Sequence, residues 1–307
     1  MPIDGADNLC GGLFHISQVL EFFVHLCIMH SLYYPAYKKF LCLAKDCPMN
    51  CCRFYRISFF KWEEKKFGKG DWADIDGKGN DIRHYLEQDA QGWFCRRKDD
   101  KSCVFLNNED MCSIQRRIGP QAMPSVCRTY PRLITRFDDR IEFSLDPCCP
   151  QAVRLLENCE PWAPEIEGVG PLAGDGAYQK RARVLALFAD RQVNLEACIE
   201  ALDREYEVGR ESLPHFEGSA TFLEFVRKVT ALLIFSYVLP YDGFPAFPSV
   251  AHFILDALER YAAASPWEKE ETFSERSFGF ARFLIDYVEE VGFDVEFEDR
   301  YIDSQEV

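Results

Sequence analysis

Cysteine is the residue type in this chain that is best suited to chemistry. Ten of the 14 cysteines fall between residues 42 and 149 of a 307-residue chain. Such crowding, in a chain without secretory features, indicates a metal or redox site rather than disulfide staples. Thiolates from separate loops bind zinc or an iron–sulfur cluster. The candidate ligands are Cys42, Cys47, Cys51, Cys52, Cys103, Cys112, Cys127, Cys148 and Cys149.

The spacing of these cysteines leaves the metal open. Nine thiols exceed the needs of one four-coordinate ion, so two metal sites, or one cluster with structural cysteines, are both compatible with the sequence. We expect an iron–sulfur cluster, of the 4Fe–4S type, with zinc as the alternative. Adjacent cysteines point in different directions, so Cys51/Cys52 and Cys148/Cys149 are expected to give one ligand each. Five isolated cysteines are expected to pack as small apolar residues: Cys10, Cys27, Cys95, Cys159 and Cys198.

Turns and short elements must position these thiols. Apolar and polar residues alternate over residues 133–137 and 140–145, which predicts a β-hairpin across Asp138-Asp139. Asp81 can cap a helix that is expected to run to about Asp89. The cysteine-containing part is therefore predicted to be rich in loops and short elements.

The rest of the chain has a helical pattern. Apolar residues recur at three- and four-residue spacing, and the expected helices cover residues 177–190, 194–208, 219–238, 248–264 and 272–291. The predicted fold class is mainly α with a small β-hairpin. The predicted domains are an N-terminal extension (1–33), a loop-rich cysteine-cluster domain (34–157), a linker (158–176) and an all-helical domain (177–307).

The N-terminal stretch Leu13–Met29 is a poor signal peptide and a poor membrane span. It lacks a basic start and a cleavage site, and it contains His and Glu residues. We expect an amphipathic helix there, with Met29 as an alternative translation start, and we expect a cytoplasmic protein that does not bind membranes.

Charge is unevenly distributed along the chain. Residues 150–307 hold 30 of the 50 Asp and Glu residues but only 14 of the 35 Lys and Arg residues. This acidity disfavours nucleic-acid binding, because phosphate contacts need Lys and Arg. It fits a solvated helical surface or a basic, lysine-bearing partner protein.

Several sequence blocks resemble the flagellin lysine N-methylases, and more loosely the zinc- or iron-chelating cysteine-cluster proteins. The resemblance covers about residues 34–157. Its blocks are Lys39-Phe-Leu-Cys42, Asp46-Cys47, Cys51-Cys52, Cys103-Val-Phe-Leu106, Met111-Cys112-Ser-Ile-Gln115, Ile118-Gly119, Cys127-Arg-Thr-Tyr-Pro-Arg132 and Ser144-Leu-Asp-Pro-Cys148. The resemblance implies transfer of a methyl group from S-adenosylmethionine to flagellin lysines, in a protein that holds an iron–sulfur cluster.

Such a reaction needs groups that hold the lysine amine and take its proton. Tyr130, Asp146 and Tyr55 lie near cysteines in the sequence and are the candidate catalytic residues. Arg128 and Arg132 are candidates for binding the S-adenosylmethionine carboxylate or the cluster sulfurs, with salt bridges to nearby acids as the alternative.

Two other functions stay open at this point. The cysteines could form a zinc or iron site that only holds loops together, or an electron-transfer centre, in both cases without methyltransferase activity. The Gly168-Val-Gly motif follows no apolar strand and is expected to be a loop rather than a nucleotide site. The six histidines form no zinc motif, so His84 and His215 are expected to be surface or packing residues.

Overall fold

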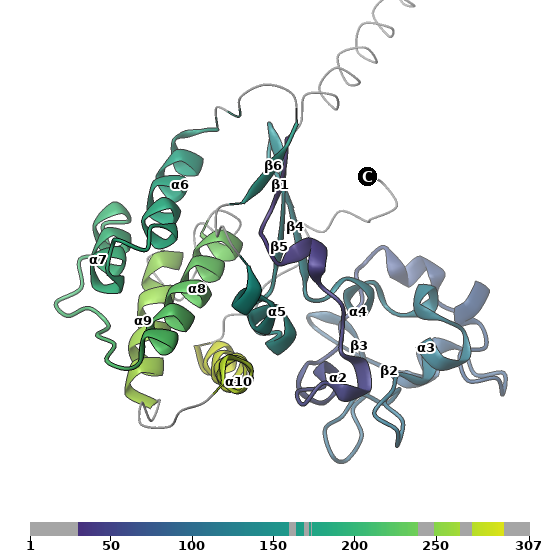
Figure 1. Ribbon diagram of the computed structural model, residues 1–307. Helices are drawn as coiled ribbons and strands as arrows, with labels where there is room; N and C mark the ends of the chain where they lie inside the picture. Colours follow the sequence, from purple (N-terminus) through teal and green to yellow (C-terminus); the bar gives the residue numbers. More distant parts are fainter. Residues whose placement is uncertain are drawn as a thin grey trace, which may run out of the picture.

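A four-stranded sheet lies near the middle of the computed structural model, with long helices on one side and most of the cysteine-containing segment on the other (Figure 1). The structure describes residues 30–159, 164–168, 172, 174–238, 249–264 and 272–291. The stretch Leu13–Met29 lies outside these residues. No helix in the described ranges is long and apolar enough to cross a membrane.

The predicted hairpin is confirmed, but it is half of a larger sheet. Strands β4 (Arg132–Arg136) and β5 (Arg140–Leu145) pair antiparallel, as expected. Strand β1 (His30–Tyr33) pairs parallel with β5, and β6 (Glu165–Glu167) pairs antiparallel with β1, which gives the order β4-β5-β1-β6. The sequence did not predict the two added strands, because β1 joins a partner more than a hundred residues away and β6 is short and polar.

The cysteine-containing segment consists of short elements. It contains the helices α2 (Cys51–Phe54), α3 (Ser113–Arg117) and α4 (Ser125–Thr129), the strands β2 (Leu86–Asp89) and β3 (Gly92–Cys95), and the single-turn 3-10 helices η1 (Tyr37–Lys39), η2 (Ala44–Asp46), η3 (Glu63–Lys66), η4 (Gly70–Trp72), η5 (Ile82–Tyr85) and η6 (Pro120–Ala122).

The expected helix from Asp81 to Asp89 is wrong beyond its first turn. Asp81 does cap a turn, because its side chain accepts a hydrogen bond from the Arg83 backbone N–H at 2.7 Å. The chain then leaves the helical path and forms β2, which pairs antiparallel with β3. Pairing with β3, which contains the buried residues Phe94 and Cys95, outweighs the local helical pattern.

The helices predicted for the second half are confirmed. Each predicted range matches one helix to within a few residues. The observed helices are α6 (Gly176–Ala189), α7 (Leu195–Glu205), α8 (Ala220–Tyr237), α9 (Val250–Ala264) and α10 (Phe273–Val291). Before them, α5 (Pro150–Leu155) and η7 (Leu156–Asn158) follow the last cysteine pair. The fold is therefore mainly α.

Among the residues that the structure describes, the buried apolar side chains form two clusters. The larger one joins the long helices to the sheet, and it includes Leu32 of β1, Leu145 of β5, Cys148 and Cys149. The smaller one lies within the cysteine-containing segment, around Trp72 and Ile82. The sheet and the second cysteine pair thus share a hydrophobic core with the helices. The domain boundaries drawn from the sequence stay a prediction.

A buried ion cluster connects β5 to the helices. Glu142 accepts hydrogen bonds from Arg140 Nε and from Arg181 Nη2 of α6, both at 2.6 Å. The three side chains are between 1% and 3% exposed. Arg181 also donates to the Phe235 carbonyl of α8 at 3.0 Å. The Glu142 carboxylate therefore neutralises charge that the interior cannot hydrate.

We expect Glu142→Gln to lower the free energy of unfolding by about 3 to 5 kcal/mol, because the buried guanidinium of Arg181 loses its anionic partner and that of Arg140 keeps only its pair with the partly exposed Asp139. Chemical denaturation measures this. Asp286→Asn is the matched control, since it removes a carboxylate from an exposed pair with Arg282 and should cost less than about 0.5 kcal/mol. Equal losses in the two variants would contradict the role given to Glu142.

Candidate functional site

Six thiols from four segments gather within the cysteine-containing part, and we call this group the thiol pocket. Hydrogen bonds join Cys51 to Cys52 and Cys95 to Cys103. Burial, and to a smaller extent the nearby thiols of Cys51, Cys103 and Cys112, raise the pKa of Cys127, which therefore belongs to the same group. The members are Cys51 and Cys52 of α2, Cys95 of β3, Cys103 and Cys112 before α3, and Cys127 of α4.

Backbone hydrogen bonds hold these short segments together. Asn50 caps α2 by accepting from the Cys52 N–H at 3.1 Å, and the Cys52 carbonyl accepts from the Cys103 N–H at 2.7 Å. The buried Glu63 carboxylate anchors the start of α4, because it accepts from the backbone N–H and the hydroxyl of Ser125 at 2.9 and 2.8 Å. The thiols are therefore brought together by contacts between loops rather than by one long element.

The thiol pocket disfavours thiolates at some positions and favours them at others. Burial raises the pKa of Cys127 and of Cys112. The hydrogen bond between Cys95 and Cys103 raises the pKa of Cys95 and lowers that of Cys103 to about 7. A soft metal would bind the thiolate forms, release their protons and stabilise the segments that carry them.

The donor set fits an iron–sulfur cluster or zinc by its chemistry, because several thiols from separate segments meet. In the described ranges, no three His, Cys, Asp or Glu side chains already stand in an arrangement that would hold a metal ion. The hydrogen-bonded thiol pairs would have to separate and lose their protons to act as ligands. The ligand set drawn from the sequence stays a prediction.

The other predicted ligands lie outside the thiol pocket. Cys42 is exposed and Cys47 is half-buried. Cys47 lies close enough to Cys42 and Cys51 for their charges to affect its pKa. Burial raises the pKa of Cys149 to about 12, with a smaller effect from Cys47. Cys148, the other member of the second cysteine pair, lies close to a further set of groups.

That set is a buried network of tyrosines around one carboxylate, which we call the Asp146 network. Asp146 Oδ1 accepts hydrogen bonds from the Cys148 backbone N–H at 2.8 Å and from the Tyr237 hydroxyl at 2.9 Å. The Cys148 thiol also contacts the Tyr55 hydroxyl. Tyr55 and Tyr130 share a hydrogen bond between their hydroxyls at 3.1 Å. The three candidate catalytic residues therefore lie together in space, although their roles stay a prediction.

The Asp146 network adjoins the thiol pocket through two helix ends. Tyr55 is the residue that ends α2, which carries Cys51 and Cys52. Tyr130 is the residue that ends α4, which carries Cys127. Their rings lie 5.2 Å apart, centroid to centroid. Any shift of α2 or α4 caused by a metal in the pocket would reach these two hydroxyls directly.

Burial sets the proton affinities of the network. It raises the pKa of Asp146, against the opposing effect of its hydrogen bonds from Cys148 and Tyr237. It also raises the pKa of Tyr55 and of Tyr130, so both phenols stay neutral. A carboxylate with raised proton affinity beside neutral hydroxyls is suited to hold a cationic amine and take a proton from it.

The two candidate arginines, Arg128 and Arg132, differ in their contacts and in their unused hydrogen-bond donors. Arg128 donates from Nη2 to the Ser125 hydroxyl at 2.8 Å, while its buried Nε has no hydrogen-bond partner within the described part of the chain. Arg132 lies over the Phe40 ring, 5.0 Å from its centroid, and donates to the Phe40 carbonyl at 3.2 Å. Arg128, which follows Cys127 in the sequence, therefore keeps an unused donor, and within the described ranges it forms no salt bridge.

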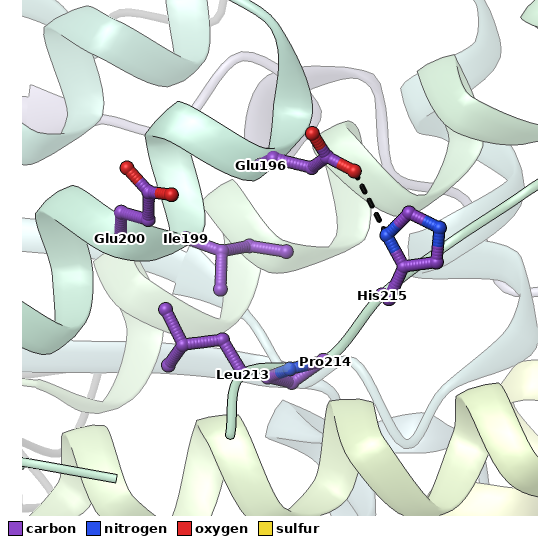
Figure 2. A pocket seen from close by; sticks show the side chains of 6 residues that line it. All are labelled: Glu196, Ile199, Glu200, Leu213, Pro214 and His215. Carbon is purple, nitrogen blue, oxygen red and sulfur yellow. Dashed lines mark ion pairs between the residues drawn. The ribbon is translucent and has the colours of Figure 1, made fainter. Parts of the chain in front are cut away.

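An open depression of about 160 Å³ lies elsewhere, between α7 and the loop that follows it (Figure 2). Its lining includes Glu196, Glu200 and His215, and His215 Nδ1 pairs with Glu196 Oε1 at 2.8 Å. The His215 side chain is 60% exposed, which confirms it as a surface residue. The depression holds no thiol and belongs to the acidic surface of the helices.

Sequence reasoning missed one residue of the thiol pocket and one of the Asp146 network. Cys95 was expected to pack as a small apolar residue, since a lone cysteine in an apolar stretch has no partner at a metal-site spacing. Its thiol nevertheless forms a hydrogen bond with the free thiol of Cys103. Tyr237 ends a long apolar helix and resembles a core aromatic. Its neighbour Ser236 was a weak signal, because consecutive polar groups at the end of an apolar helix indicate hydrogen-bond partners nearby.

Comparison with known proteins gives a limited but consistent result. The chain is 23% identical over 121 residues to the flagellar biosynthetic protein FliU of Salmonella muenchen, a match that covers 39% of this chain and 72% of that protein. It is 23% identical over 127 residues to a lysine-N-methylase of Salmonella typhimurium, covering 40% and 32%, and 22% identical over 121 residues to that of Salmonella choleraesuis, covering 39% and 30%.

No protein-family model and no solved structure matches the chain. The matched part spans about a third of the length of the two lysine-N-methylases. Over about two fifths of its own length, the chain therefore resembles proteins named lysine-N-methylases.

Proposed function

We propose that the protein is a cytoplasmic lysine N-methyltransferase that moves a methyl group from S-adenosylmethionine to lysine side chains of flagellin, with an iron–sulfur cluster held by the thiol pocket. The observation that carries this proposal is the contact between Tyr55 and Tyr130 at the ends of α2 and α4. It places a buried carboxylate network, suited to an amine, against the segments that carry the thiols.

Asp146 and the two tyrosines act on the lysine amine. A lysine side chain is an ammonium ion at neutral pH and has no free electron pair for attack. Asp146 attracts this ion, and its raised proton affinity lets it take one proton. The neutral hydroxyls of Tyr55 and Tyr130 accept hydrogen bonds from the remaining N–H groups and orient the lone pair.

The transfer step then balances with one co-substrate. The neutral amine attacks the methyl carbon of S-adenosylmethionine, a nitrogen–carbon bond forms and the carbon–sulfur bond breaks. The sulfur leaves as S-adenosylhomocysteine, and the proton on Asp146 passes to water. Arg128 is suited to bind the carboxylate of the methyl donor, since its buried Nε has no other partner among the described residues.

The thiol pocket supplies the ligands for the cofactor. When bound, an iron–sulfur cluster provides electron-transfer chemistry and cross-links the segments that hold it. The chain contributes six thiols there, of which Cys95 and Cys103 are paired and buried. The acidic surface of the helical half, including the depression at Glu196 and Glu200, favours approach of a lysine-bearing protein.

We expect Cys127→Ser and Cys95→Ser each to lower the iron bound per chain by about half or more, since loss of a ligand weakens the cluster and its segments together. Iron analysis after anaerobic purification measures this. Cys198→Ser is the matched control for Cys95→Ser, because Cys198 is buried like Cys95 but lies in α7. Full iron content in Cys127→Ser would exclude it as a ligand.

Asp146→Asn should lower kcat/KM for flagellin methylation by roughly 10²- to 10⁴-fold, the range for loss of a general base. Asparagine keeps an oxygen that accepts from Cys148 and Tyr237, so the fold should persist. Transfer of labelled methyl groups from S-adenosylmethionine to purified flagellin measures the rate. Asp256→Asn is the control, because Asp256 also accepts from a tyrosine, Tyr287, at 2.7 Å.

The same assay tests the proposed function itself. Methylation of flagellin lysines by the iron-loaded wild type supports it. Failure of that wild type to bind S-adenosylmethionine in calorimetry would contradict it, and would favour a cysteine-cluster protein with a structural or redox role. Equal activity of wild type and Asp146→Asn would contradict only the role given to Asp146.

A further inference from the structure

Tyr237 is held in one orientation at the point where the helices meet the site. It is the last residue of α8, it is 2% exposed, and its hydroxyl donates to Asp146 Oδ1 at 2.9 Å. The preceding residue, Ser236, shares a hydrogen bond with Ser144 of β5 and donates to the Leu145 carbonyl at 3.2 Å. Two consecutive residues of α8 therefore form hydrogen bonds with the end of β5 and with Asp146, the residue that follows it.

The hydrogen bonds of Asp146 are divided unevenly between its two oxygens. The backbone N–H of Cys148 and the hydroxyl of Tyr237 both donate to Oδ1. The main chain is pinned as well, because the Asp146 N–H donates to the Pro131 carbonyl at 2.7 Å. With the backbone held, the Tyr237 hydroxyl, together with the neighbouring Cys148 thiol, restricts the rotation of the carboxylate.

We propose that Tyr237 is a positioning residue for methyl transfer, which holds Oδ1 of Asp146 so that Oδ2 is presented to the substrate amine. This role rests on the proposed function. Tyr237 does not touch the amine in this arrangement; it acts through Asp146. A group that must meet a reacting atom within a fraction of an ångström loses much of its effect when it is free to rotate.

Tyr237→Phe tests this role, because it removes only the hydroxyl and keeps the ring against Phe253, 6.3 Å between centroids. Tyr287→Phe is a closely matched control. Tyr287 is also 2% exposed and also donates to a carboxylate, Asp256, but between α10 and α9. Both variants lose one hydrogen bond between a buried tyrosine and an aspartate, so both should lose some stability.

The readout is kcat and KM for flagellin in the full, iron-loaded chain. We expect kcat of Tyr237→Phe to fall by roughly tenfold to a hundredfold, with KM nearly unchanged, because docking of the substrate protein involves other surfaces. Tyr287→Phe should keep both constants. The double variant Asp146→Asn/Tyr237→Phe should be no slower than Asp146→Asn alone, since Tyr237 acts through that carboxylate.

Two results would overturn the role of Tyr237 while the proposed function stands. The first is an active wild type in which Tyr237→Phe and Tyr287→Phe have the same kcat. The second is a double variant whose loss is the product of the two single losses, because Tyr237 would then act independently of Asp146. A wild type that methylates no flagellin lysine and binds no S-adenosylmethionine would instead remove the proposed function, and this role with it.

Discussion

One carboxylate joins the parts of the molecule that must meet for any chemistry at this site. Asp146 receives a hydrogen bond from the end of α8 through Tyr237 and another from the turn before α5 through Cys148. Its own N–H reaches the Pro131 carbonyl, next to Tyr130. The long helices, the sheet and the cysteine-containing segment are thus tied at a single buried anion, whose desolvation cost these donors offset.

The buried thiols differ from the Asp146 carboxylate, because some of them cannot easily become anions. Burial raises the pKa of the Cys127 and Cys112 thiols, so ionising either of them without a nearby positive charge is costly. A bound metal would supply that charge, so folding of the short segments and metal binding are expected to be coupled. Because Tyr55 and Tyr130 end the helices that carry three of these thiols, that coupling would also set the geometry around Asp146.

How much could be predicted from the sequence depended on how local the determining interactions are. The five long helices follow apolar periodicity within each segment, and the hairpin of β4 and β5 follows alternation across a short turn. The parallel pairing of β1 with β5 has no local signal. The candidate residues Tyr55, Tyr130 and Asp146 came from their closeness to cysteines, and the fold brings them together.

The residues that sequence reasoning missed are linked to the site only through the fold. Cys95 joins Cys103 because β3 turns back toward it, and Tyr237 reaches Asp146 from a helix more than ninety residues later. Neither contact leaves a spacing pattern. The sequence likewise identified nine candidate thiols. It could not show which of them lie in the thiol pocket and which, like Cys47, Cys148 and Cys149, lie outside it, because that depends on three-dimensional contacts.

The most direct test of the thiol pocket as an iron–sulfur site is the visible spectrum of the anaerobically purified chain, with iron, acid-labile sulfide and zinc measured on the same sample. A brown protein with broad absorbance that contains iron and sulfide together is the predicted result. A colourless protein that contains zinc and no sulfide would contradict it.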